Sequence, residues 1–289
     1  MKIAVTSDNH TNQMSPHAQA NFNAMIQNTI EPFNEIDVFC VAGDLGEGTL
    51  MPPNQDFMER LLGSHPKTLF VMGNHDLFSK ASKKLTPDLA MEKNLKLLKH
   101  GTPLEVSWKD DSTVVDIGDC SFIGTIGFPD FKHPMLPMPR KCYENDCNHR
   151  TIDSTYISLK KWCDWTDSLN TAFKKRLDKA VAGNQKNVII ISHYPCFLSH
   201  SRGDHTDPVW PYFYNHQLGV MILEAAQANP TKKFWSIAGH SHEYCLGLWK
   251  MEWDNLYTLG IRTTYAQNAC YVFDTEKDPL IDRGTTNIP

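Results

Sequence analysis

The chain has 289 residues, 41% of them hydrophobic and 21% charged, which is the composition of a globular protein large enough to bury a full core. Its formal net charge of −5 argues against an extended surface for nucleic acid or for anionic membranes, so neither is expected as a partner. No apolar run is long enough for a transmembrane span.

The first third of the chain predicts a parallel sheet, because short apolar runs rich in strand formers alternate with segments of helical spacing. The predicted strands cover 2–7, 38–42 and 68–72, and the predicted helices cover 16–30, 57–62 and 87–100. This alternation implies parallel strands joined by right-handed crossovers.

The rest of the chain predicts a second group of strands. Antiparallel patterns are expected in 114–127 and 244–274, strands at 188–192 and 234–238, and helices at 155–181 and 217–228. Together these elements predict an α/β (α+β) fold with two mixed sheets packed face to face and flanked by helices, a four-layer α-β-β-α sandwich.

No repeat or linker divides the sequence, so residues 1–289 are predicted to form a single domain. Two irregular stretches near 128–153 and 194–215 are expected to be insertions in that domain. Loops of this length are either functional or disordered, and the pattern does not decide whether 128–153 is a lid.

Side chains of the metal-binding type follow five of the predicted strands. The clusters are Asp8-Asn9-His10, Gly43-Asp44, Gly73-Asn74-His75-Asp76, His193 and Gly239-His240-Ser241-His242. Ligand sites collect at strand ends in α/β folds. Each cluster alone is a weak signal, since an Asp-x-His pair is more often a capped turn, but the fixed order of all five indicates one site.

This order of motifs resembles the calcineurin-like metallophosphoesterase superfamily, and the resemblance spans residues 8–242. It implies a binuclear centre in which one metal ion is held by Asp8, His10, Asp44 and His242. The second ion is then held by Asp44, Asn74, His193 and His240, so that Asp44 bridges the pair. Mixed imidazole and oxygen ligands suit divalent or trivalent Mn, Fe, Zn, Co or Ni better than Mg or Ca.

His75 and Asp76 are left over from metal ligation in this scheme. The resemblance implies that His75 lies beside the phosphate, where it stabilises the transition state or protonates the leaving oxygen, and that Asp76 orients it. A carboxylate on one ring nitrogen would fix the tautomer of an imidazole and raise its basicity. The alternative for Asp76 is a helix or turn cap.

The predicted function is metal-dependent hydrolysis of a phosphate ester by a metal-bound hydroxide, with no covalent intermediate. One alternative is an exonuclease of the DNA-repair branch of the same superfamily, although no dense basic patch supports it. An alternative of another class is a non-catalytic metal-binding scaffold, although all seven presumed ligands and His75 are present.

The substrate is predicted from the loop that follows His193. Its candidate substrate-binding residues are Arg202, His205, Trp210 and Tyr212, with Phe213 and Asp204 nearby. Aromatic rings next to polar groups suit a stacked base, which favours a small phosphodiester or nucleotide. The alternative is that these rings only pack the loop onto the body of the domain.

The location is predicted to be cytoplasmic. The eight cysteines are scattered, several of them within apolar runs, which is typical of reduced core thiols. Met1 leads almost directly into the first predicted strand and leaves no room for a signal peptide. The sequence does not indicate the oligomeric state.

Overall fold

The computed structural model describes most of the chain. The described residues are 1–10, 20, 23–24, 35–46, 52–77, 87–105, 107, 112–134, 158–201, 210–245, 247–264 and 269–277. Among them, no helix is both long and apolar enough to cross a membrane.

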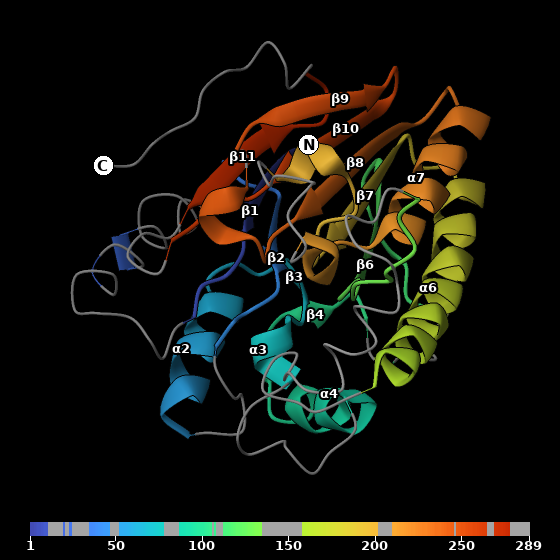
Figure 1. Cartoon of the computed structure of the whole chain (residues 1–289). Coiled ribbons are helices and arrows are strands. Elements are labelled where there is room, and N and C mark those ends of the chain that lie inside the picture. The colour runs from blue at the N-terminus through green and yellow to red at the C-terminus, as the bar shows by residue number, and fades with distance from the viewer. Residues whose placement is uncertain are drawn as a thin grey trace.

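One sheet has five strands and pairs the first described strand of the chain with the last (Figure 1). Its order is β11 (Cys270–Asp274), β1 (Lys2–Thr6), β2 (Val38–Ala42), β3 (Thr68–Val71) and β4 (Thr102–Pro103). Strands β1 to β4 are parallel, whereas β11 runs antiparallel to β1. The sheet is therefore mixed, as predicted.

The second sheet has six strands and is also mixed. Its order is β5 (Val115–Ile117), β6 (Cys120–Thr125), β7 (Asn187–Ser192), β8 (Lys233–Ala238), β10 (Leu256–Gly260) and β9 (Trp249–Trp253). The four inner strands are parallel, and the two edge strands are antiparallel to their neighbours.

Helices lie outside both sheets (Figure 1). The described helices are α2 (Pro52–Leu62), α3 (Asn74–Leu77), α4 (Pro87–Leu95), α6 (Leu159–Ala182) and α7 (His216–Ala228), with short 3₁₀ turns η2 (Leu198–His200), η3 (Trp210–Phe213) and η4 (His242–Tyr244). Side chains cap the two long helices, since Ser158 accepts from the N–H of Lys161 and Asn215 accepts from the N–H of Leu218.

The alternation of side chains along the strands explains the layers. In β2, Val38 and Cys40 point into the core between the sheets, whereas Phe39 packs against the cluster that holds residues of α2 and α4. In β7, Ile189 lies between the sheets, whereas Ile190 packs with residues of α6 and α7. Three apolar layers therefore separate four layers of backbone, which confirms the predicted sandwich.

Several predicted boundaries differ from the structure. Helix α4 ends at Leu95 rather than His100, and α2 begins at Pro52 rather than Phe57. The stretch 244–274 does not form one antiparallel unit, because β10 is parallel to β8 and β11 joins the other sheet. Most of the helix predicted at 16–30, most of the 128–153 stretch and the tail after residue 277 lie outside the described residues.

Candidate metal centre

The ends of strands from both sheets meet at one place and are tied there by hydrogen bonds. The N–H of Asp8 donates to the carbonyl of Gly43 at 3.1 Å, which joins the ends of β1 and β2. The Nδ1 atom of His193, after β7, bonds to the carbonyl of Ala42 at 2.8 Å and so links the two sheets. The N–H of His240, after β8, donates to both carboxylate oxygens of Asp8 at 3.1 and 2.9 Å. These bonds set the ligand side chains against one another.

Glycines in the motifs leave space that ligand side chains fill. A Cβ atom at Gly43 would lie 2.5 Å from Nδ1 of His193, and one at Gly73 would lie 2.0 Å from Oδ1 of Asp44. At Gly239 a Cβ atom would lie 1.8 Å from Oγ of Ser7. Gly43 also has a φ of +88°, which side chains rarely adopt. The motif glycines are therefore explained by close approach to the site.

The backbone is strained where the predicted ligands lie. Within the described part of the chain, the non-glycine residues with positive φ are Asp8, His10, Asp44, Phe131, His240 and His242. All of these except Phe131 are predicted metal ligands. Residues are held in this region only where the surroundings over-determine them, and such positions cluster at functional sites.

A first group of candidate ligands consists of Asp8, His10 and His242, whose ligand atoms all lie within 4.8 Å of one another. The Nε2 atom of His242 lies 3.2 Å from Nε2 of His10 and 3.6 Å from Oδ1 of Asp8. The rings of His10 and His242 are stacked, with centroids 5.0 Å apart. Asp8 and His10 are buried, whereas His242 is partly open to solvent.

A second group consists of Asp44, His193 and His240, within the same 4.8 Å limit. The Oδ1 atom of Asn74 joins it, at 2.8 Å from Nε2 of His193 and 3.0 Å from Nδ1 of His240. All seven ligands predicted from the sequence therefore belong to two adjacent groups, with Asp44 close to both.

The Oδ2 atom of Asp44 lies between the groups, 3.7 Å from Nε2 of His10 and 3.3 Å from Nε2 of His193. It is buried and accepts no hydrogen bond from the described residues. Its Oδ1 atom accepts from the N–H of His75 at 3.0 Å, which fixes the carboxylate. A buried carboxylate oxygen without a donor is costly, and a cation on each side would satisfy it.

The tautomer of His193 also fits a metal ion. A carbonyl oxygen can only accept, so Nδ1 donates to Ala42, and Nε2 is the atom that faces the oxygen of Asn74 at 2.8 Å. In the metal-free chain a proton on Nε2 lies between these two atoms, and a metal ion would take the place of that proton. A backbone partner on the far nitrogen is the usual support for a metal-binding imidazole.

The charges of the metal-free centre are strongly coupled. Burial lowers the pKa of His193, but the Asp44 carboxylate outweighs burial and raises the pKa to about 9. Burial tends to raise the pKa of Asp44, but the neighbouring imidazoles, His193 first, hold it well below its usual range. Burial lowers the pKa of His10 to about 4 and that of His240 well below its ordinary value. A metal ion bound by the second group must therefore displace the proton of His193.

His75 lies at the edge of the first group. Its ring meets that of His10 edge to face, with centroids 4.8 Å apart, and its nitrogen falls within 4.8 Å of ligand atoms of His10 and Asp44. It is only half-buried. This geometry allows either the neighbouring catalytic role predicted from the resemblance or direct ligation.

The carboxylate of Asp76 accepts three backbone hydrogen bonds. Its donors are the N–H groups of Gly73 at 2.8 Å, Leu45 at 3.2 Å and Gly46 at 3.1 Å. Burial, and then the charge of Asp44, raises the pKa of Asp76 to about 7. These contacts fit the alternative of a turn cap, and they tie the turn after β2 to the turn after β3.

The predicted substrate-binding residues fall into two sets. Trp210 is only 6% exposed, and its ring stacks on that of Tyr214 with centroids 4.7 Å apart. Tyr212 is partly buried, and its ring packs against Phe131 at 5.0 Å. These contacts favour the packing alternative for both rings. Arg202 and His205 lie outside the described residues.

Two other aromatic residues contact the centre. The ring of Tyr194 lies 3.8 Å from that of His240 and is buried, whereas Phe213 lies 5.2 Å from the same ring and is 39% exposed. Tyr194 was not predicted to belong to the site, although its position directly after His193 places it at a ligand strand end. Phe213 is exposed and Trp210 is buried. The sequence could not predict this difference, because a loop without periodicity does not show which side chains face the interior.

The family model for calcineurin-like phosphoesterases matches residues 1–244. No curated protein matches the chain. Among solved structures, the 5'-nucleotidase of Candida albicans SC5314 matches with 14% identity and a TM-score of 0.43, over 92% of this chain and 46% of that one. The sulfate thiohydrolase SoxB of Termus thermophilus in complex with glycerol matches with 13% identity and a TM-score of 0.45, over 94% of this chain and 55% of that one. The chain thus spans about half the length of these two proteins.

Proposed function

Because the chain belongs to the calcineurin-like phosphoesterase family, we propose that it hydrolyses a phosphate ester at a centre of two metal ions. The observation that carries this proposal is the position of Asp44 Oδ2, a buried oxygen without a hydrogen-bond donor among the described residues that faces a group of ligands on each side. Asp8, His10 and His242 would hold one ion, and Asn74, His193 and His240 would hold the other.

Two bound ions would supply the positive charge that attracts a phosphate anion and would lower the pKa of the attacking water. Nitrogen and oxygen ligands in one shell favour Mn, Fe, Zn, Co or Ni. The two carboxylates at the centre, Asp8 and Asp44, cancel only part of the charge of two such ions. A chain with a net charge of −5 can thereby bind an anion at one point.

The protein's own part in catalysis centres on His75. The half-buried ring stands beside the first group, and the backbone N–H of the same residue holds Asp44 in place. From that position the imidazole would bond to a phosphate oxygen or give a proton to the leaving oxygen. Asp76 would act as a positioning residue, because its carboxylate fixes the turns that carry Asp44 and His75.

The proposed substrate is a small phosphodiester or a nucleotide. Phe213 supports this choice because its ring is exposed and lies 5.2 Å from the ring of His240, one of the proposed ligands. A phosphate held at the centre would place its organic group within reach of this ring, and stacking on an aromatic side chain typically contributes about 1–3 kcal/mol per base. Phe213 thus replaces Trp210 as the proposed aromatic platform.

The compartment is proposed from the cysteines. Among the described cysteines, Cys40, Cys120, Cys196, Cys245 and Cys270 are buried thiols. Buried free thiols fit a reducing compartment such as the cytoplasm.

The test of the proposed function is turnover of bis-p-nitrophenyl phosphate and p-nitrophenyl phosphate with added manganese. The proposal predicts hydrolysis by the wild-type protein and its loss in Asp44→Asn. Binding of manganese without turnover of either ester, of nucleotides or of single-stranded DNA would contradict it and favour a metal-binding scaffold.

The substrate class is tested with Phe213→Ala and, as a matched control, Trp210→Phe, which keeps a buried ring. Phe213→Ala should raise KM for a nucleotide diester about tenfold. The KM for bis-p-nitrophenyl phosphate should change much less. Equal effects on both esters would exclude Phe213 as a base platform.

A further inference from the structure

Strand β9 forms one edge of the six-stranded sheet, and within the described residues it pairs on one side only, with β10 (Figure 1). Four of its five residues, Lys250 to Trp253, are exposed. Met251 is 51% exposed and Trp253 is 47% exposed, and Leu248 just before the strand is 49% exposed. An exposed edge strand with apolar side chains has unpaired N–H and C=O groups that can bond to a strand of another chain.

Strand β9 also carries two charged side chains. Lys250 and Glu252 are exposed, and neither forms an ion pair with the part of the chain that the structure describes. Charged residues on an edge commonly protect it from unselective pairing, and the bulge in the β9–β10 ladder acts in the same direction. The order of the charges along β9 nevertheless allows one antiparallel pairing of two copies of the strand.

The sequence of β9 is Trp-Lys-Met-Glu-Trp, which is complementary to itself when two copies run antiparallel. With Met251 on a twofold axis, Lys250 of each copy lies opposite Glu252 of the other. Opposite charges directly across two strands are stabilising. The two tryptophans add no aromatic pair, because the bulge at Glu252 turns Trp249 and Trp253 to opposite faces of the sheet, where their register partners are Leu259 and Leu256.

Shifted registers are unfavourable. A shift by two residues in one direction places Lys250 opposite Lys250, and the same shift in the other direction places Glu252 opposite Glu252. Like charges directly opposite each other destabilise a strand pair. The charges therefore disfavour the two nearest alternative registers, which makes a symmetric interface more specific.

We propose that two copies of this chain associate through β9, which would extend the sheet continuously from six strands to twelve across a twofold axis. The partner is a second copy because the pattern of charges complements itself. A contact of one short strand and a few apolar side chains is at the small end of protein interfaces, so the dimer is a weak and reversible one.

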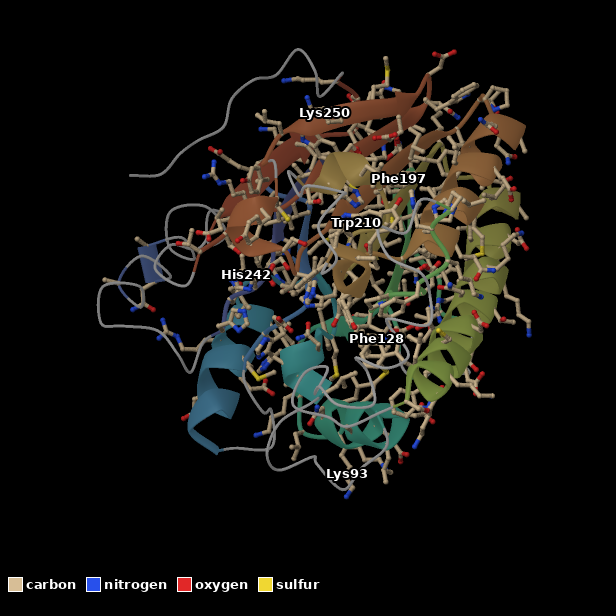
Figure 2. All side chains as sticks on the ribbon, in the orientation of Figure 1. Lys93, Phe128, Phe197, Trp210, His242 and Lys250 are labelled. Atoms are coloured by element: carbon tan, nitrogen blue, oxygen red, sulfur yellow. The ribbon has the colours of Figure 1, made fainter. Side chains whose placement is uncertain are left out.

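The dimer leaves the metal centre accessible. In Figure 2, Lys250 lies toward the top of the view, well away from His242, and Lys93 on α4 lies at the opposite end of the molecule. Substitutions on β9 are therefore expected to change association without changing metal content. Lys93→Glu serves as the control for a change of charge at a distant exposed lysine.

The experiment is sedimentation velocity over a range of roughly 1 to 100 µM protein. The wild-type protein should pass from monomer to dimer, and Lys250→Glu or Glu252→Lys should weaken association at least tenfold by setting like charges opposite each other. The double variant Lys250→Glu/Glu252→Lys should restore dimerisation because it exchanges the partners. Lys93→Glu should dimerise as the wild type does.

Circular dichroism melting of each variant shows whether a loss of association follows from unfolding, and these exposed positions predict unchanged melting. The proposal is overturned if the wild-type protein stays monomeric throughout. It is also overturned if the single variants dimerise normally, or if the double variant fails to recover.

Discussion

A Cβ atom at Gly73 would lie 2.0 Å from Oδ1 of Asp44. The turn after β3 therefore packs directly against the carboxylate after β2, and no side chain fits between them. The N–H of His75 donates to that same oxygen at 3.0 Å. The third strand end therefore acts as a support that holds the proposed bridging carboxylate in place.

Gly73→Ala should consequently reduce both metal content and turnover. The added methyl group must push Asp44 aside or shift the turn, at a cost of about 1–3 kcal/mol in the free energy of unfolding. Metal analysis and melting of the purified variant measure the two effects. Gly183→Ala is the matched control, because the nearest atom to its added Cβ belongs to the flexible side chain of Gln185 at 2.9 Å. Full metal content in Gly73→Ala would contradict the proposed support.

His75→Ala should retain its metal ions and lose turnover by roughly 10²–10⁴-fold, the usual size of a contribution from general acid catalysis. The loss should be smaller for esters with a good leaving group, which needs no proton. Measurement of kcat across p-nitrophenyl and alkyl esters separates the roles. Loss of a metal ion would instead make His75 a ligand, as its closeness to His10 and Asp44 permits.

Metal binding by the second group should strengthen as the pH rises. In the metal-free chain the pKa of His193 is raised to about 9, although burial acts to lower it, because Asp44 lies beside it. A metal ion needs the neutral ring and must displace this proton, so affinity should increase about tenfold per pH unit below about pH 9 and level off above it. Titration of a His10→Ala variant with zinc isolates this group. An affinity independent of pH between 6 and 8 would contradict the assignment.

His200 should make the fold sensitive to acid. Its ring is completely buried, with Nδ1 accepting from the N–H of Cys196 and Nε2 donating to the carbonyl of Ser236. Burial lowers its pKa from 6.5 to about 4, so the unfolded chain binds a proton more readily than the folded chain does. The contribution is complete above pH 6.5 and is lost as the pH falls from 6.5 to about 4.

The loss amounts to about 3 kcal/mol, since each pKa unit corresponds to about 1.4 kcal/mol. Urea unfolding of the wild-type protein and of His200→Gln at pH 7 and pH 4 measures it. The variant should lose less stability than the wild type on acidification, because glutamine takes up no proton. Parallel losses in both proteins would exclude His200 as the cause.

The sequence predicted which residues follow the buried strands, because a strand and the residues after it form a local pattern. An apolar run such as 188–192 reads as a buried strand, and the parallel arrangement of such strands brings the residues after them to one edge. The resemblance then supplied the division of the ligands into two groups, which stays a prediction. The ligand atoms of Asp8, His10 and His242 lie within 4.8 Å of one another, as do those of Asp44, His193 and His240.

Other features depend on long-range contacts that no local pattern contains. Strand β11 pairs with β1 although most of the chain separates them. The sequence of β11 alone does not predict which strand it pairs with. The ring of Trp210 also packs against His133, which is far from it in the sequence. Asp76 bonds to the turn after β2 rather than acting only within its own motif.

The measurement that tests the account most directly is the number of metal ions per chain in the wild type, Asp44→Asn and His10→Ala, determined by elemental analysis after dialysis against manganese or zinc. The account predicts two ions in the wild type. Asp44→Asn should weaken both sites, because a neutral amide replaces the shared carboxylate, whereas His10→Ala should weaken mainly the first. Two ions held by Asp44→Asn with unchanged affinity would contradict the central claim that Asp44 bridges the pair.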